Sequence, residues 1–130
     1  MRLSGKTAFI TGAARGIGFE FAKAYVREGA RVAIADINIE RAQSAAAEIG
    51  DAAIAVEIDV SNQESIDRAV AFAAEALGGI DILINNAALF SAAPIVEVTR
   101  TDYDRTFQVN VAGTFFTMQA VAKHMIARGK

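Results

Sequence analysis

Three glycines stand close together near the start of the chain, between a short apolar run and a segment with helical spacing. They are Gly12, Gly16 and Gly18, in the stretch ITGAARGIGFEFAKAY. Glycine has no Cβ, so it adopts positive φ and lets another molecule approach the backbone closely. A helix start adds unpaired N–H groups and the positive end of the helix dipole. The pattern predicts a phosphate-binding turn; its structural alternative is a turn that packs a small-residue helix closely on a sheet.

A carboxylate follows the glycines at the end of the next apolar run. Asp36 closes the segment RVAIAD, where an acidic side chain of a dinucleotide site accepts hydrogen bonds from ribose hydroxyls. Its charge repels a 2′-phosphate, which favours NAD over NADP. Arg15 argues the other way, because a guanidinium beside the turn pairs with a 2′-phosphate. We rank Asp36 above Arg15 and expect NAD; the alternative for Asp36 is a solvated strand end.

Apolar runs that alternate with helical patterns must position these residues. The runs predict strands at 7–11, 31–36, 53–59 and 81–85, and helices from Ile17 to Gly29, over 39–49, from Ser61 to Gly78 and after Thr101. In the third helix, Ser61 and Glu64 have capping-box spacing. The order βαβαβαβα predicts an α/β fold with a doubly wound parallel sheet of the Rossmann type and strand order 3-2-1-4.

Composition narrows the function classes. The 130 residues are 53% hydrophobic, enough for the core of one domain, and the net charge of −2 predicts neither a nucleic-acid partner nor a membrane-surface partner. The chain has no cysteine and one histidine, which excludes disulfides, thiolate sites and multi-histidine metal sites, so we expect no metal. The apolar run before Gly12 is too short for a signal peptide, and we expect a cytoplasmic protein without a membrane span.

Four motifs carry a family resemblance. TGAARGIG at 11–18, DV at 59–60, NNAA at 85–88 and VNVAGTF at 109–115 resemble the successive motifs of the short-chain dehydrogenase/reductase family, in order and at family intervals. Within that family, REGARVAIADIN and the segment from NNAALF to NVAGTFF are similar to bacterial polyol dehydrogenases of the sorbitol type. The resemblance implies an NAD-dependent oxidoreductase that moves hydride between nicotinamide and a polyol or ketose.

The resemblance also implies roles for individual residues. Cofactor contacts are expected from the glycine turn and from the ends of the third and fourth strands: Gly12, Arg15, Gly16, Ile17, Gly18, Asp59, Val60, Asn86 and Ala87. Asp59 and Val60 would hold the adenine, and Asn110 would belong to the catalytic tetrad and hold a water in a proton relay. Ala88 departs from the glycine that is usual in the family.

Each of these polar residues has a structural alternative. Asp59 could cap the helix that begins at Ser61, and the amide of Asn86 could bind backbone groups of its own loop. Asn110 lies among apolar residues of a helix, where an amide needs partners, and could tie the fourth helix to the fourth strand. His124 lies beside Lys123 near a helix end and is expected to face solvent or a partner subunit.

The family's chemistry requires a Tyr with a Lys four residues later, and neither tyrosine qualifies, since Tyr25 precedes Gly29 and Tyr103 precedes Phe107 at that spacing. The resemblance therefore implies that residues 1–130 are the dinucleotide-binding half of a single Rossmann-type domain. On this interpretation the chain ends before a fifth strand, and the catalytic Ser, Tyr and Lys lie outside it. The alternative is an inactive fragment that serves as a nucleotide-binding or self-associating module.

The fourth helix is apolar on most of its sides, which predicts extensive burial. With the unpaired edge of the fourth strand, this favours a homo-oligomer built through the helix, the edge or both. The residues expected on one broad apolar side are Phe107, Val111, Phe115, Met118, Val121, Ala122 and Met125.

Overall fold

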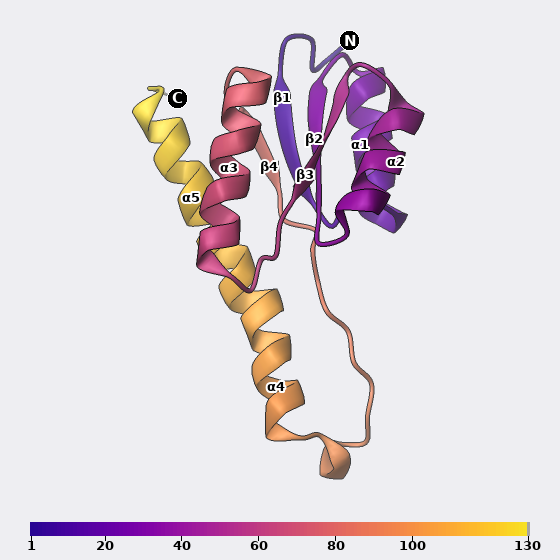
Figure 1. Cartoon of the computed structure of the whole chain (residues 1–130), viewed down its shortest axis with the longest axis vertical. Helices are drawn as coiled ribbons and strands as arrows, with labels where there is room; N and C mark the ends of the chain where they lie inside the picture. Colours follow the sequence, from indigo (N-terminus) through magenta and orange to yellow (C-terminus); the bar gives the residue numbers. More distant parts are fainter. Residues whose placement is uncertain (130) are drawn as a thin grey trace.

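The computed structural model describes residues 1–129, in which a central parallel sheet carries helices on both faces (Figure 1). The sheet is four-stranded, in the order β3-β2-β1-β4, and confirms the predicted 3-2-1-4 topology. Its strands are β1 (Thr7–Thr11), β2 (Arg31–Asp36), β3 (Ala53–Glu57) and β4 (Ile82–Ile84). The helical elements are α1 (Gly16–Arg27), α2 (Ile39–Ile49), α3 (Gln63–Leu77), the 3-10 turn η1 (Ile95–Glu97), α4 (Arg100–Phe107), the π-helical segment η2 (Gln108–Gly113) and α5 (Thr114–Ala127).

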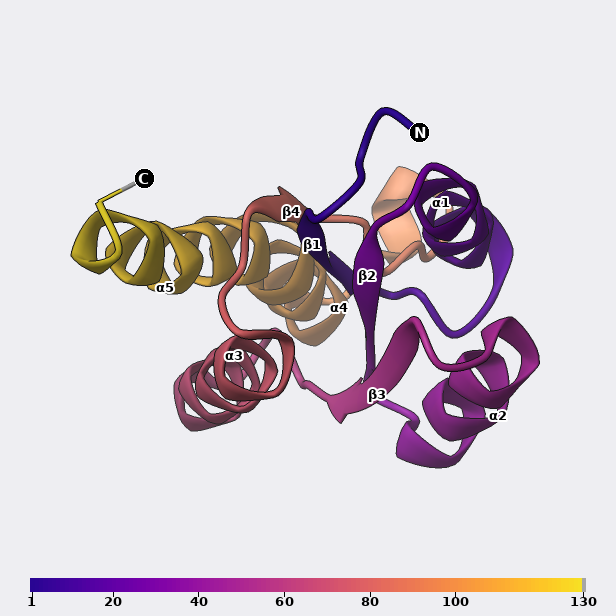
Figure 2. The ribbon, with the colours of Figure 1, turned by 90° about the horizontal axis from the view of Figure 1, so that it is seen from above.

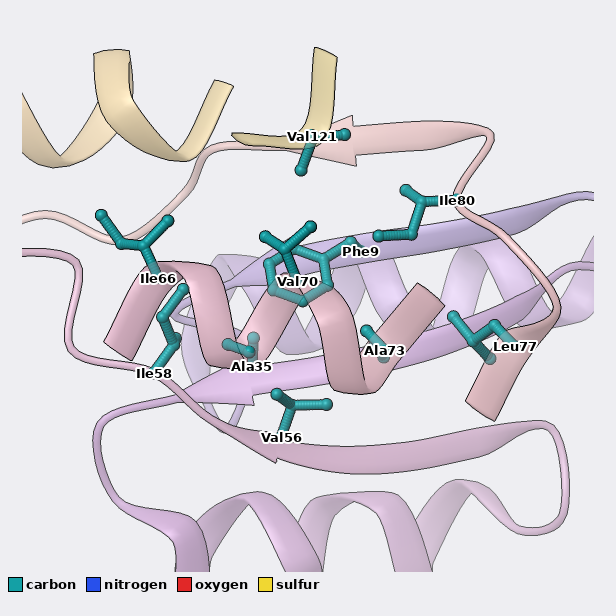
Figure 3. Packing of buried hydrophobic residues seen from close by; sticks show 12 residues of the cluster. Phe9, Ala35, Val56, Ile58, Ile66, Val70, Ala73, Leu77, Ile80 and Val121 are labelled. Carbon is teal, nitrogen blue, oxygen red and sulfur yellow. The ribbon is translucent and has the colours of Figure 1, made fainter. Parts of the chain in front are cut away.

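The two faces of the sheet bury two separate cores, because side chains alternate along each strand. On β1, Phe9 and Ile10 are both fully buried but belong to different clusters. Ile10 packs with α1 and α2, while Phe9 packs with α3 and α5, as Figures 1 and 2 show for the helices. Figure 3 shows Phe9, Val70 of α3 and Val121 of α5 as members of the same buried cluster. Burial of a side chain such as Phe9 contributes about 1.5–3 kcal/mol.

Two strands are shorter than the sequence predicts, because side chains take over hydrogen bonding at their ends. β3 ends at Glu57 rather than Asp59, whose backbone N–H turns away from the sheet and donates to Ser65 Oγ at 2.8 Å. β4 covers only residues 82–84 of the expected 81–85. Past its end, the backbone N–H of Asn86 donates to Thr11 Oγ1 at 3.0 Å.

The capping of α3 also differs from the prediction. Ser61 was expected to open the helix, but the cap is Asn62, whose Oδ1 accepts from the backbone N–H of Ser65 at 2.9 Å. The Ser61 hydroxyl is engaged elsewhere and donates to Asp59 Oδ1 at 2.6 Å. The helix ends, as predicted, at Gly78, which adopts a left-handed conformation with φ of 77°.

The predicted fourth helix is a long rod of three consecutive segments, α4, η2 and α5, which begins after the Thr99 cap. Figure 1 shows α4 extending beyond the sheet while α5 lies beside α3. The residues expected on one apolar side differ in burial within this chain: Val121 is buried in the core and Met125 packs against it, but Phe107, Val111 and Phe115 are exposed. Within residues 1–129, no helix combines the length and hydropathy that a membrane crossing requires.

Candidate cofactor site

A cleft of about 740 Å³ opens at the carboxyl ends of the strands, the edge at which ligands bind in open α/β sheets. Residues from the loops that follow all four strands, and from the α4 and η2 segments of the rod, line this cleft. The lining residues that the structure describes are Gly12, Arg15, Gly16, Asp36, Ile37, Asn38, Arg41, Ile58, Asp59, Val60, Ser61, Asn86, Ala87, Ala88, Leu89, Arg105 and Val109. Residues far apart in the sequence thus share one concave surface.

The glycine turn forms one wall of this cleft. Gly16 has φ of +62°, and a Cβ built there would meet no other atom of the chain within 4 Å. The N-terminus of α1 carries no side-chain cap, whereas Asn38, Asn62 and Thr99 cap the helices that follow them. Open space beside uncapped helix N–H groups suits the oxygens of a pyrophosphate, so the residues present fit a dinucleotide.

The other two glycines are held by packing. A Cβ on Gly18 would lie 2.5 Å from both Asn86 Nδ2 and Gly12 O, and one on Gly12 would lie 2.9 Å from Ala87 Cα. These distances are too short for any side chain, so both glycines allow the turn to approach the loop after β4. Gly18 is buried and Ile17 is 70% exposed, and neither lines the cleft beside Gly12, Arg15 and Gly16.

Asp36 reaches from the end of β2 toward the glycine turn. Its Oδ2 accepts from the backbone N–H of Ala14 at 3.2 Å, and its Oδ1 accepts from the backbone N–H of Asn38 at 3.0 Å. Because an ionised carboxylate offers about four acceptor positions, these two bonds leave capacity for hydroxyl donors. Asp36 therefore both fixes the turn and presents a negative charge to the cleft.

Asp59 and Val60 lie together at the opposite wall. Asp59 Oδ1 accepts from the backbone N–H of Ser61 at 2.9 Å and from its hydroxyl at 2.6 Å, which is a turn-forming role just before α3. Val60 lines the cleft and also packs against η2, since a Cβ on Gly113 would lie 2.8 Å from Val60 Cγ2. This wall is thus joined to the α4–η2–α5 rod.

Asn86 ties the loop after β4 to the glycine turn. Its Nδ2 donates to Gly12 O at 3.0 Å. Thr11 Oγ1, which is nearly fully buried, accepts the backbone N–H groups of both Asn86 and Ala87, each at 3.0 Å. The Asn86 amide therefore binds backbone between two loops, rather than within its own loop, and it also lines the cleft.

Asn110 stands in η2, where hydrogen bonding wider than that of an α-helix marks many functional sites. Its Oδ1 accepts from Leu89 N at 2.7 Å and its Nδ2 donates to Leu89 O at 2.8 Å. The amide thus ties the rod to the loop beyond β4, not to the strand itself. Asn110 does not line the cleft, whereas its partner Leu89 does.

Two arginines of the cleft were missed by the sequence analysis. Arg41 lies in the first turn of α2, shortly after Asp36, and its place after a predicted strand end could have indicated it. Arg105 comes from α4, and nothing in the sequence shows where that helix lies against the sheet. His124 does not simply face solvent, because its Nε2 accepts from the backbone N–H of Ile80 at 3.2 Å and the side chain is only partly exposed.

Known proteins resemble this chain in sequence and in structure. A family model described as short chain dehydrogenase matches residues 6–130. A sorbitol dehydrogenase from Cereibacter sphaeroides is 67% identical over the whole chain, and a galactitol 2-dehydrogenase from Agrobacterium fabrum is 54% identical, each match covering 51% of the relative. A crystal structure of 3-ketoacyl-(acyl-carrier-protein) reductase from Brucella melitensis, complexed with NADH, is 38% identical with a TM-score of 0.93 over 98% of this chain and 52% of that one.

The chain therefore spans about half the length of the curated relatives it matches. The family match covers the glycine turn, all four strands and the Asn110 segment, and it confirms the resemblance drawn from the motifs. Fold, topology and sequence agree: the chain belongs to the short chain dehydrogenase family.

Proposed function

We propose that residues 1–130 form the dinucleotide-binding half of a single Rossmann-type domain, with NAD as the cofactor. The observation that carries this is the uncapped N-terminus of α1 beside the open space at Gly16, within a cleft that also holds Asp36. The NADH complex of the structural relative supports a nicotinamide cofactor. When bound, such a cofactor supplies hydride transfer at its nicotinamide ring.

In this proposal each part of the chain has a task. The α1 N–H groups and Gly16 bind the pyrophosphate, and Asp36 accepts the ribose hydroxyls while its own contacts fix the turn. Asp59 and Val60 form the adenine wall, and Asn86 and Ala87 form the wall beyond β4. Through Leu89, Asn110 positions the loop that carries this second wall, and in the catalytic tetrad it would also hold a relay water.

The proposed substrate is a polyol or the corresponding ketose, such as sorbitol, in a cytoplasmic enzyme. The names of the two polyol dehydrogenases support this class. The general acid-base pair would come from sequence outside these residues, since no Tyr or Lys lines the cleft in the part of the chain that the structure describes. The second candidate is a nucleotide-binding module without turnover, which the same observation favours.

Titration of NADH fluorescence with the purified chain tests the proposal. We expect saturable but weak binding, because only half of the cofactor is contacted. Absence of saturation up to millimolar NADH would refute it. Sustained sorbitol-dependent NADH formation by the pure chain would instead refute the view that the proton-transfer groups lie elsewhere.

The preference for NAD is tested at Asp36. In Asp36→Asn the side chain keeps its size and one acceptor oxygen but loses its charge. The affinity for NADPH should therefore rise relative to the affinity for NADH. Asp36→Ala also frees the N–H of Ala14 and should weaken both cofactors. If the ratio of NADH affinity to NADPH affinity is unchanged in both variants, Asp36 does not determine which cofactor binds.

We also propose that the chain forms a homo-oligomer through the α4–α5 rod, the outer edge of β4, or both. Among the described strands β4 pairs only with β1, and an apolar groove of about 490 Å³ on the rod includes Phe107, Val111 and Phe115. Light scattering should give a mass above 13.7 kDa, and Phe115→Glu should lower it if the rod is the interface. A stable monomer at micromolar concentration would contradict the proposal.

A further inference from the structure

The α4 segment of the rod contributes one arginine, Arg105, to the lining of the cleft. Within residues 1–129, the Arg105 guanidinium forms no ion pair and no hydrogen bond. Arg100 of the same helix differs, because its Nε donates to Asp104 Oδ1 at 3.1 Å and the residue lies outside the cleft. The Arg105 guanidinium is therefore available to a ligand in the cleft.

The rod follows the wall formed by Asp59 and Val60 along one of its faces. Gly113 packs against this wall, since a Cβ on it would lie 2.8 Å from Val60 Cγ2. Val109, about one turn earlier, lines the cleft, and so does Arg105, about one turn before Val109. Residues about four positions apart share one face of a helix. Arg105 therefore continues the face that begins in contact with Val60.

A hydrogen bond holds this part of the rod beside the loop after β3. Gln108 Nε2 donates to Ser61 O at 3.1 Å. Gln108 comes three residues after Arg105, which is about 4.5 Å along a helix and shorter than an extended arginine side chain. The carboxylate of Asp59 is engaged with Ser61 and forms no ion pair with Arg105 among the described residues. The guanidinium thus starts from backbone that is fixed near the Asp59 wall.

The surroundings of Arg105 favour a flat ring over a phosphate. The uncapped helix end that suits phosphate lies beside Gly16, in the loop after β1, and β2 separates β1 from β3 in the sheet. The cleft residues on the same rod face and on the wall that it follows include the apolar Val109 and Val60. A guanidinium is planar and weakly hydrated, and it stacks on flat rings, nucleobases among them. A planar cation beside apolar side chains suits a purine ring.

We propose that Arg105 stacks its guanidinium plane on the adenine ring of the bound dinucleotide and closes the adenine end of the cleft from the side of the rod. This rests on the proposed function, in which Asp59 and Val60 form the adenine wall. Arg105 is then a specificity-determining residue for the base, because a purine offers a larger flat face than a pyrimidine. It acts on the base rather than on the ribose or the phosphates.

The experiment compares ADP with UDP, which share the ribose and the diphosphate and differ in the base, by titration calorimetry of the chain. Wild type should bind ADP more tightly than UDP. Arg105→Ala should weaken ADP about fivefold and UDP less than about twofold. Arg105→Lys keeps the positive charge but not the plane, so it should also lose most of the preference for ADP. The matched control is Arg100→Ala, on the same helix but outside the cleft, which should change neither affinity.

The other outcomes separate this inference from the proposed function. Equal affinity of wild type for ADP and UDP, an unchanged ADP affinity in Arg105→Ala, or an equal loss of both nucleotides would overturn the inference alone. So would an Arg105→Lys variant that binds ADP as tightly as wild type, because positive charge would then suffice. If wild type binds neither ADP nor NADH, the proposed function fails and the inference with it. If Arg105→Ala fails to fold by circular dichroism, Arg105→Gln is held to the same criterion.

Discussion

The contact between the glycine turn and Asn86 can be tested by adding one methyl group. In Gly18→Ala the new Cβ would lie 2.5 Å from Asn86 Nδ2 and from Gly12 O, and 2.9 Å from Ala13 Cα. Two of these three neighbours are backbone atoms, so the turn itself must move. Overpacking of this kind lowers the free energy of unfolding by about 1–3 kcal/mol. The better helix propensity of alanine offsets at most about 1 kcal/mol of this loss.

Urea denaturation measures the loss. With an m value of about 2 kcal/mol per M, a loss of 2 kcal/mol lowers the unfolding midpoint by about 1 M. Gly16→Ala is the contrasting variant, because its Cβ meets no atom within 4 Å and its cost comes only from the positive φ of +62°. That conformational cost is about 1–2 kcal/mol. Stability alone therefore does not separate the two causes.

A double-mutant cycle with Asn86→Ala separates them. Removing the Asn86 amide relieves part of the clash in Gly18→Ala but none of the strain in Gly16→Ala. We expect a coupling free energy of at least about 0.5 kcal/mol for Gly18 with Asn86, and additive effects for Gly16 with Asn86. Additivity in both cycles, or a Gly18→Ala variant as stable as wild type, would refute the packing explanation.

Three further predictions concern Asn110, Glu28 and Thr117. Asn110→Asp keeps the acceptor for Leu89 N but loses the donor to Leu89 O, so it should lower the free energy of unfolding by about 1–3 kcal/mol in urea titrations. Hydrogen bonds from the backbone and side chain of Arg2 lower the pKa of Glu28 below its usual value of 4.5. The ionised Glu28 carboxylate therefore stabilises the fold above that pH, and this stabilisation is lost in more acidic solution. Glu28→Gln should flatten this pH dependence in thermal unfolding. The fully buried Thr117 hydroxyl lacks a partner among the described residues, so Thr117→Val should raise stability by about 1 kcal/mol, and a less stable variant would contradict this.

The sequence predicted the fold where local signals and tertiary structure agree. β1, β2 and α2 have the expected bounds, because apolar strands and the glycine after Ile49 are unambiguous. The prediction of the α3 cap was wrong because two neighbouring side chains could each have capped the helix. Ser61 and Asn62 are equally good caps in isolation, and only the proximity of Asp59 decides that Asn62 caps α3.

The cleft was predictable in part. The carboxyl ends of parallel strands share one edge, so residues that follow strands were expected there, as Asp36 and Asn86 illustrate. The positions of Arg105 and Asn110 depend on where the α4–α5 rod lies, and hydrophobic periodicity does not contain that information. The contact of His124 with Ile80 was missed for the same reason.

The π-helical segment η2 links two ends of the rod that are fixed to different parts of the molecule. On one side Asn110 is bonded to Leu89, and on the other Val121 is buried in the core. Each residue of an α-helix turns the chain by about 100°, so losing one residue to restore regular helix would rotate Val121 away from its pocket or Asn110 away from its loop. The number of residues between these two anchors is therefore itself under constraint, and during evolution this stretch should accept substitutions far more readily than insertions or deletions.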